Sequence, residues 1–303
     1  MALPHESTVP FITDGGLETT LVFLDGIDLP DFAAFPLLDD EEGRAALRRY
    51  YAPYLELADQ RGTSFVLDTP TWRANPDWGA RLGYDAARLA AVNRDAVQFV
   101  AGLAQEFPRV DTVINGVIGP RGDGYVVRAA MSADAAADYH ALQAAAFGAG
   151  GAAMISAVTM TYADEAIGVA QAATAAGLPA VVSFTVETDG RLPSEQHLAD
   201  AIAAVDDATG TPPAYYMINC AHPTHFLSVL ERGGEWVTRI KAVRANASRL
   251  SHAELDEATE LDRGDISEFA DLYAQLASVL DLRVVGGCCG TDHQHIAAIT
   301  APR

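Results

Sequence analysis

Three cysteines are placed so that their thiols can meet at one point. Cys288 and Cys289 are adjacent within a glycine cluster that runs from Gly286 to Gly290, and Cys220 ends an earlier apolar run. Glycines around adjacent cysteines allow unusual backbone angles, so both sulfurs can face one centre. Three thiolates with an open fourth position are typical of a catalytic zinc ion, whereas a structural zinc has four protein ligands. These cysteines therefore predict a catalytic Zn²⁺ site.

An open position on zinc indicates the chemistry. A substrate thiol that binds the metal is stabilised as its thiolate, which lowers its pKa below the ~8.5 of a free thiol. Such a thiolate can attack a methyl group on a charged sulfur or nitrogen centre. We therefore expect the protein to methylate a small thiol at sulfur.

The cysteines also have simpler explanations. Cysteine is often a small buried core residue, and this explanation suits Cys220 alone best. A disulfide framework is not expected, since the count is odd and two cysteines are adjacent, and a vicinal disulfide needs strained geometry and an oxidising compartment. The histidines near the cysteines are more typical of helix caps or surface residues than of ligands, so they are left out of the predicted site: His222, His225, His293 and His295.

The elements that must position these cysteines alternate between strand and helix. Apolar, β-branched runs predict eight strands, and alanine-rich stretches with helical periodicity lie between them. The predicted strands are 11–14, 64–68, 112–116, 153–157, 180–184, 215–219, 238–243 and 282–285, and the predicted helices are 40–61, 85–107, 133–150, 164–177, 195–209, 222–232 and 267–280. This alternation predicts an α/β fold, a single (β/α)₈ TIM barrel in one domain over residues 1–303.

Polar residues follow several predicted strands, at the end of a barrel where catalytic residues lie. Asp14 ends the first strand and is expected either to hold the amino group of an amino-acid substrate or to cap the next helix. Glu18 would orient the substrate or face a helix dipole. Thr69 follows the second strand and Asn115 lies at the end of the third; both suit a polar substrate, although turns also favour them. We predict that all four bind substrate and that Asp14 also acts in catalysis.

The composition limits the partners. The chain has 41 acidic and 20 basic residues and a net charge of −21, which would repel nucleic-acid phosphates and anionic lipids. No apolar run approaches the ~20 residues of a membrane span, and the first residues lack the pattern of a signal peptide. We therefore expect a cytoplasmic protein with small-molecule partners, and no feature predicts an oligomeric state.

Four motifs together resemble the homocysteine S-methyltransferase family, which includes betaine-homocysteine methyltransferase and the homocysteine-binding module of cobalamin-dependent methionine synthase. They are Asp-Gly-Gly-Leu-Glu-Thr at 14–19, Ile-Gly-Pro at 118–120, Asn-Cys at 219–220 and Gly-Gly-Cys-Cys-Gly-Thr at 286–291. The resemblance spans the chain and implies a (β/α)₈ barrel, Zn²⁺ on Cys220, Cys288 and Cys289, and a thiol acceptor such as homocysteine or selenohomocysteine. It also implies that Asp14 lies near the acceptor's amino group.

The resemblance has one departure and leaves the methyl donor open. Val158 stands where the family often has a glutamate thought to hold the acceptor, so thiol methylation is better supported than homocysteine itself. Eight βα units use the whole chain, so a small onium donor such as S-methylmethionine, S-adenosylmethionine or a betaine is expected. Trp72, Trp78 and Tyr125 could line a pocket for such a cation, although core packing is the commoner role of aromatic residues.

Two other functions use the same residues. A barrel metallohydrolase would activate water on the metal and would need Asp14 or Asp68 as its acid-base group. A non-catalytic subunit would instead present a thiol acceptor to a cobalamin protein. Hydrolysis without an added thiol would identify the first, and activity of the isolated chain with a soluble donor would argue against the second.

Overall fold

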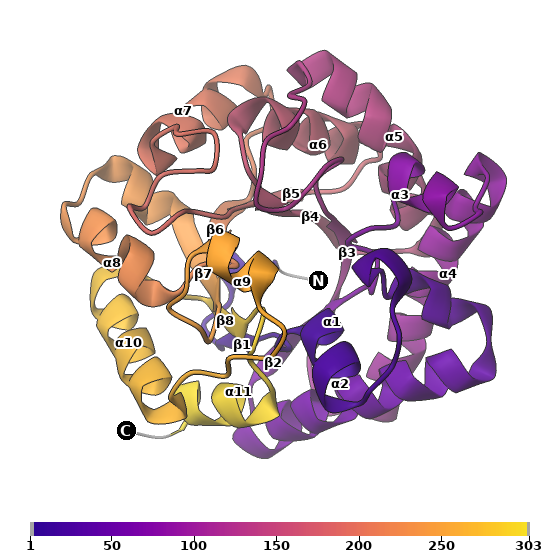
Figure 1. Ribbon diagram of the computed structural model, residues 1–303, viewed down its shortest axis with the longest axis horizontal. Helices are drawn as coiled ribbons and strands as arrows, with labels where there is room; N and C mark the ends of the chain where they lie inside the picture. Colours follow the sequence, from indigo (N-terminus) through magenta and orange to yellow (C-terminus); the bar gives the residue numbers. More distant parts are fainter. Residues whose placement is uncertain (1–2, 302–303) are drawn as a thin grey trace.

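Eight parallel strands form a closed barrel in the computed structural model, which describes residues 3–301. The strands pair in chain order and β1 closes the barrel by pairing with β8 (Figure 1). Their bounds are β1 Phe11–Ile12, β2 Ser64–Asp68, β3 Thr112–Ile118, β4 Met154–Met160, β5 Ala180–Phe184, β6 Tyr215–Asn219, β7 Ile240–Ala245 and β8 Val284–Gly287. The predicted (β/α)₈ barrel is confirmed, with each strand within a few residues of its predicted place.

Seven long helices surround the barrel and match the predicted ones. They are α2 Glu41–Arg61, α4 Ala86–Glu106, α5 Ala133–Gly150, α6 Ala163–Ala175, α7 Leu198–Ala208, α8 Pro223–Glu231 and α10 Ile266–Val279. The short helices α1 Leu17–Thr19, α3 Pro76–Arg81, α9 His252–Glu257 and α11 His293–Ile299 were not predicted. Within residues 3–301 no helix combines the length and the apolar character needed to cross a membrane.

Capping residues explain where the long helices begin and end. The side chains of Asp40, Asp85 and Ser132 accept hydrogen bonds from the first turns of α2, α4 and α5. Gly62 and Gly151 end α2 and α5 with φ of 64° and 89°, a left-handed conformation that favours glycine. These local signals fix the helices that hold the strands in place.

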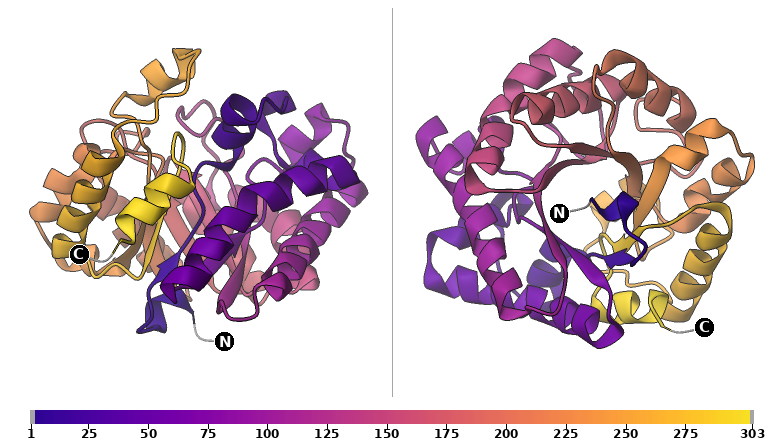
Figure 2. Two further views of the ribbon diagram at one scale, coloured as in Figure 1. Left: turned by 90° about the horizontal axis from the view of Figure 1, so that it is seen from below. Right: turned by 180° about the vertical axis from the view of Figure 1, so that it is seen from behind.

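The inside of the barrel changes from apolar to polar along the strands. Its apolar layers include Val66, Val113, Met154, Val181, Met217 and Ala242. Side chains on a strand alternate between its two faces, so the residues two positions later also point inward. These are Asp68, Asn115, Ser156, Ser183, Asn219 and Arg244, all buried. The N-terminal segment lies across the amino end of the barrel (Figure 2, right). The polar layer is therefore open to ligands only at the opposite end, the mouth formed by the carboxyl ends of the strands.

Candidate metal centre and substrate cavity

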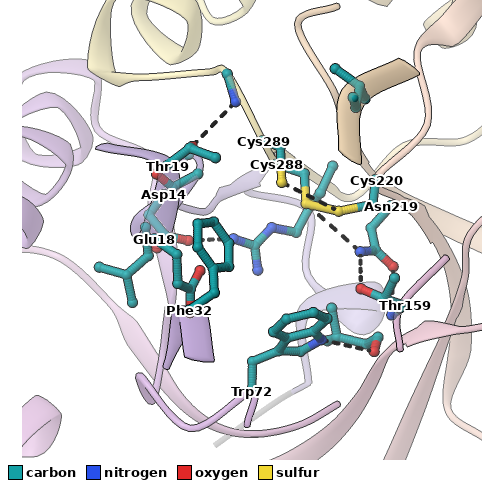
Figure 3. A pocket seen from close by; sticks show the side chains of 18 of the residues that line it. Asp14, Glu18, Thr19, Phe32, Trp72, Thr159, Asn219, Cys220, Cys288 and Cys289 are labelled. Atoms are coloured by element: carbon teal, nitrogen blue, oxygen red, sulfur yellow. Dashed lines mark hydrogen bonds and ion pairs between the residues drawn. A yellow bond between two sulfur atoms is a disulfide. The ribbon is translucent and has the colours of Figure 1, made fainter. Parts of the chain in front are cut away.

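The three cysteines meet at the mouth of the barrel. Cys220 directly follows β6, and Cys288 and Cys289 directly follow β8. Their sulfur atoms all lie within 4.8 Å of one another, and they lie together on one wall of the cavity (Figure 3). The barrel topology brings these distant parts of the sequence together because the carboxyl ends of parallel strands share one rim.

The Cys220 and Cys289 sulfurs are spaced as in a metal site. Zn–S bonds of about 2.3 Å in a tetrahedral site place two sulfurs roughly 3.8 Å apart. The Sγ atoms of Cys220 and Cys289 are 3.9 Å apart, which fits. Burial raises the pKa of the Cys289 thiol to about 11, so its thiolate needs a nearby positive charge such as a metal ion. The three residues therefore fit a thiophilic cation when they are reduced.

The structure joins Cys220 and Cys288 in a disulfide and leaves Cys289 free. This corrects the expectation that the cysteines form no disulfide. The bond is not the vicinal one between Cys288 and Cys289, because the ends of β6 and β8 bring Cys220 against Cys288 instead. A disulfide sulfur is not a thiolate, so this bond and metal binding by all three cysteines exclude each other.

The backbone at Cys220 is held in a conformation that is unfavourable for a residue with a side chain. Its φ is 54°, in the left-handed region. The Cys220 carbonyl accepts three hydrogen bonds: from Asn246 Nδ2 at 3.0 Å, from Thr185 Oγ1 at 3.3 Å and from His252 Nε2 at 2.7 Å. These donors fix the direction in which the Cys220 side chain leaves the backbone.

His252 and Tyr125 connect two of the cysteines, and His252 was not among the residues predicted from the sequence. His252 Nδ1 lies 2.9 Å from Glu187 Oε1, and its ring stacks on Tyr125 with centroids 4.0 Å apart. The Tyr125 hydroxyl donates to Cys289 Sγ at 3.8 Å. A sequence signal for this element exists, since Ser251 and Glu254 form the capping box that begins α9.

A buried network of charges lies beside the cysteines. Arg244 on β7 forms ion pairs with Asp14 and Asp68, and its Nε donates to the Gly287 carbonyl at 3.1 Å. Tyr50 donates to the second oxygen of Asp14 at 2.9 Å. Burial raises the pKa of Asp14 to about 6 although Arg244 opposes the shift. The network leaves two carboxylates sharing one guanidinium at the floor of the site.

A cavity of about 420 Å³ opens beside the cysteines. Asp14, Glu18 and Thr69 line it, as do the three cysteines. Asn115 does not line it, because this side chain lies within the polar layer and bonds Asp68 at 2.7 Å and Ser156 at 3.0 Å. Three of the four predicted substrate residues thus line the same cavity as the cysteines. The fourth, Asn115, lies behind Asp68.

The cavity wall combines aromatic and acidic groups. Trp72 and Tyr125 line it, whereas Trp78 does not. Burial raises the pKa of Glu18 to about 7. Val158 also lines the cavity, so the wall is apolar where the family resemblance suggests a glutamate. Four further carboxylates line the cavity, Asp123, Asp256, Glu260 and Asp262, which favours a cationic ligand.

The four histidines set aside in the sequence lie outside the cysteine cluster. His222 caps α8, and His225 Nε2 bonds the Arg249 carbonyl at 2.9 Å. His295 Nδ1 pairs with Asp292 at 2.8 Å in the cap of α11, which begins at His293. Within residues 3–301 the group of potential metal ligands contains the three cysteines and no histidine.

Comparison with known proteins identifies the family and agrees with the fold. The model of the homocysteine S-methyltransferase family matches residues 11–302, and the chain belongs to that family. The family supports thiol S-methyltransferase activity on small-molecule substrates. No curated protein matches the sequence.

Solved structures of the homocysteine methyltransferase MmuM from Escherichia coli share the fold. The metallated form has 21% sequence identity and a TM-score of 0.73, covering 98% of this chain and 96% of that chain. The oxidised form has 22% identity and a TM-score of 0.75, covering 98% and 97%. The apo form has 19% identity and a TM-score of 0.67, with the same coverage as the oxidised form.

Proposed function

We propose that the protein is a zinc-dependent S-methyltransferase that moves a methyl group from a small onium donor to a thiol acceptor, homocysteine first among them. The observation that carries the proposal is the group of three cysteine sulfurs within 4.8 Å on the wall of a small-molecule cavity. Cys220, Cys288 and Cys289 would hold the metal. Bound zinc would lower the pKa of the acceptor thiol and so supply a thiolate at neutral pH.

The residues of the chain would bind and orient the two substrates. The cavity carries an aromatic wall at Trp72 and Phe32 and a carboxylate at Glu18, which suit the positive charge of an onium group. Asp14 faces the cavity beside the cysteines and would attract an acceptor ammonium group. The walls would shield the sulfur and the methyl group from water, which favours direct transfer between them.

The hydrolase alternative is less consistent with the geometry. It needs Asp14 or Asp68 as a free acid-base group. Both carboxylates are engaged by Arg244, and each also accepts a second hydrogen bond, from Tyr50 and Asn115 respectively. A base held in this way is poorly placed to take a proton from water.

The test is the zinc content of the reduced protein, followed by methyl transfer from S-methylmethionine, S-adenosylmethionine or glycine betaine to homocysteine. We expect one zinc per chain and methionine as product. Cys288→Ser and Cys289→Ser should lose both, whereas His293→Asn, close in sequence but outside the cluster, should keep both. Full zinc content and transfer in the cysteine variants would refute the proposed site.

A further inference from the structure

Arg73 is a cavity-lining arginine that pairs with no carboxylate within residues 3–301. It follows β2, and its guanidinium carbon lies 4.9 Å from the ring centroid of Trp72 and 4.2 Å from that of Trp78. Its Nη1 donates to the backbone carbonyl of Asp31. Trp72 is itself tied to β4, since its indole N–H donates to the Val158 carbonyl at 3.4 Å. The two rings and the carbonyl fix the plane of the Arg73 guanidinium.

One edge of this guanidinium remains unused. Nε of Arg73 is buried without a hydrogen-bond partner, and Nη2 makes no hydrogen bond within residues 3–301. In three other arginines of the chain, Nε and Nη2 donate hydrogen bonds to the two oxygens of one carboxylate. They are Arg81 with Asp31, Arg109 with Asp59 and Arg239 with Asp206. Carboxylates are thus the groups that this edge binds in three other arginines of the chain.

The charge of Arg73 is poorly compensated by the protein. Burial lowers the pKa of Arg73, while Glu18, Asp123 and Asp31 raise it from distances beyond an ion pair. Arg244, the other arginine of the cavity wall, differs because it pairs with two carboxylates. A partly buried guanidinium without a paired anion is costly, and a carboxylate arriving from the cavity would offset that cost.

We propose that Arg73, through its unpaired Nη2, binds the carboxylate of a substrate in this cavity. The inference rests on the proposed function and adds to it a specificity-determining residue: Arg73, which meets the carboxylate of one substrate. Glu18 lines the same cavity and supplies the opposite charge for the cationic end. The carboxylate belongs either to the onium donor or to the amino-acid acceptor, and binding experiments separate the two.

Binding is measured on the reduced, metal-free protein, so that the result does not depend on turnover. Trp72 and Trp78 are two of the chain's three tryptophans and flank Arg73, so tryptophan fluorescence reports on this position, with calorimetry as a second measurement. One arm compares dimethylsulfonioacetate with trimethylsulfonium. The other compares L-homocysteine with 3-aminopropane-1-thiol, which lacks the carboxylate. The wild type should prefer the carboxylate member of one arm by roughly 10- to 100-fold, as expected for a charge-assisted hydrogen bond.

Two variants and a control test whether this preference for the carboxylate probe depends on Arg73. Arg73→Gln should abolish it while leaving the affinity of the member without a carboxylate unchanged, and Arg73→Lys should keep part of it. Arg81→Gln is the matched control, since Arg81 lies over Trp78 at 4.8 Å but does not line the cavity. The expected control result is an unchanged preference.

Several outcomes would overturn the proposal. Equal binding of both members in both arms by the wild type would do so, and so would no binding of any probe. A preference that survives in Arg73→Gln would also overturn it. If Arg73→Gln does not fold, the wild-type comparison and Arg73→Lys still decide the question. A protein that shows the preference but transfers no methyl group would contradict the proposed function and leave the role of Arg73 intact.

Discussion

The ring of Tyr125 lies flat on the ring of His252, with centroids 4.0 Å apart and planes inclined by 10°. Tyr125 comes from the loop between β3 and α5, and His252 begins α9, so the contact joins two loops above the barrel mouth. Each ring also contacts a cysteine residue, Tyr125 at the Cys289 sulfur and His252 at the Cys220 carbonyl. The stacked pair therefore helps to hold Cys220 and Cys289 in place, although neither Tyr125 nor His252 is a candidate metal ligand.

Removing the Tyr125 hydroxyl should weaken metal binding without unfolding the protein. Tyr125→Phe keeps the ring on His252 but removes the donor to Cys289 Sγ. Groups that hydrogen-bond metal ligands typically change metal affinity by about 10- to 100-fold, and we expect the lower end because this bond is 3.8 Å long. Competition with a chromophoric zinc chelator measures the affinity. Tyr139→Phe is the control, because its hydroxyl bonds Asn75. Equal affinities in wild type and Tyr125→Phe would contradict the supporting role.

Oxidation should release the metal by consuming two of its ligands. The reduced protein should show three reactive thiols after denaturation and bind one zinc. Protein with the Cys220–Cys288 disulfide should show one thiol, that of Cys289, and bind none. Thiol titration and metal analysis on matched samples give both numbers. Cys289→Ser should still form the disulfide, whereas Cys220→Ser should not. Retention of zinc by fully oxidised protein would show that these cysteines are not the ligands.

The barrel and the meeting of the cysteines were predictable from the sequence, since both depend on local patterns. Strands such as 64–68 and 180–184 are short apolar runs, and parallel topology sends their carboxyl ends to one rim. The Cys220–Cys288 bond was not predictable, because it depends on which sulfurs lie closest after folding. The role proposed for Arg73 was also not predictable from the sequence. Its sequence neighbours do not reveal that, unlike Arg244 on the same cavity wall, it pairs with no carboxylate in the described part of the chain.

His252 was missed for a different reason. The helix that it begins has six residues, too few to produce a clear helical periodicity, and its contacts with Glu187 and Tyr125 join residues far apart in the chain. Asn115 lies differently from its expected place. Its position at a strand end suggested a substrate contact, but the side chain completes the hydrogen bonding of Asp68 inside the barrel.

Removing the buried arginine at the floor of the site should strongly destabilise the fold. Arg244→Met leaves Asp14 and Asp68 buried without their cation, and breaking a buried ion pair typically costs about 3–5 kcal/mol. Urea unfolding measures the free energy of unfolding. Arg88→Met is the control, because its pair with Asp39 is largely exposed and should contribute about 1 kcal/mol or less. Similar losses in the two variants would mean that Arg244 does not compensate the two carboxylates.

Acid should destabilise the protein partly through Asp292, the cap of α11. Burial alone would raise the pKa of Asp292, but His295 and Arg263 outweigh it and lower the pKa to about 2. A carboxylate whose pKa is lower in the folded state stabilises the fold above its ordinary pKa near 3.8. That contribution is lost as the pH falls through 2.

The variant Asp292→Asn isolates this contribution. Between about pH 4 and pH 2, the free energy of unfolding of the wild type should fall more steeply than that of the variant. The difference in slope should be at most one proton, or about 1.4 kcal/mol per pH unit. At pH 6 the variant should be less stable, because an amide does not pair with Arg263 and His295 as a carboxylate does. Urea unfolding at a series of pH values gives both slopes. Parallel curves through this window would show that Asp292 takes up its proton equally in the folded and unfolded chains.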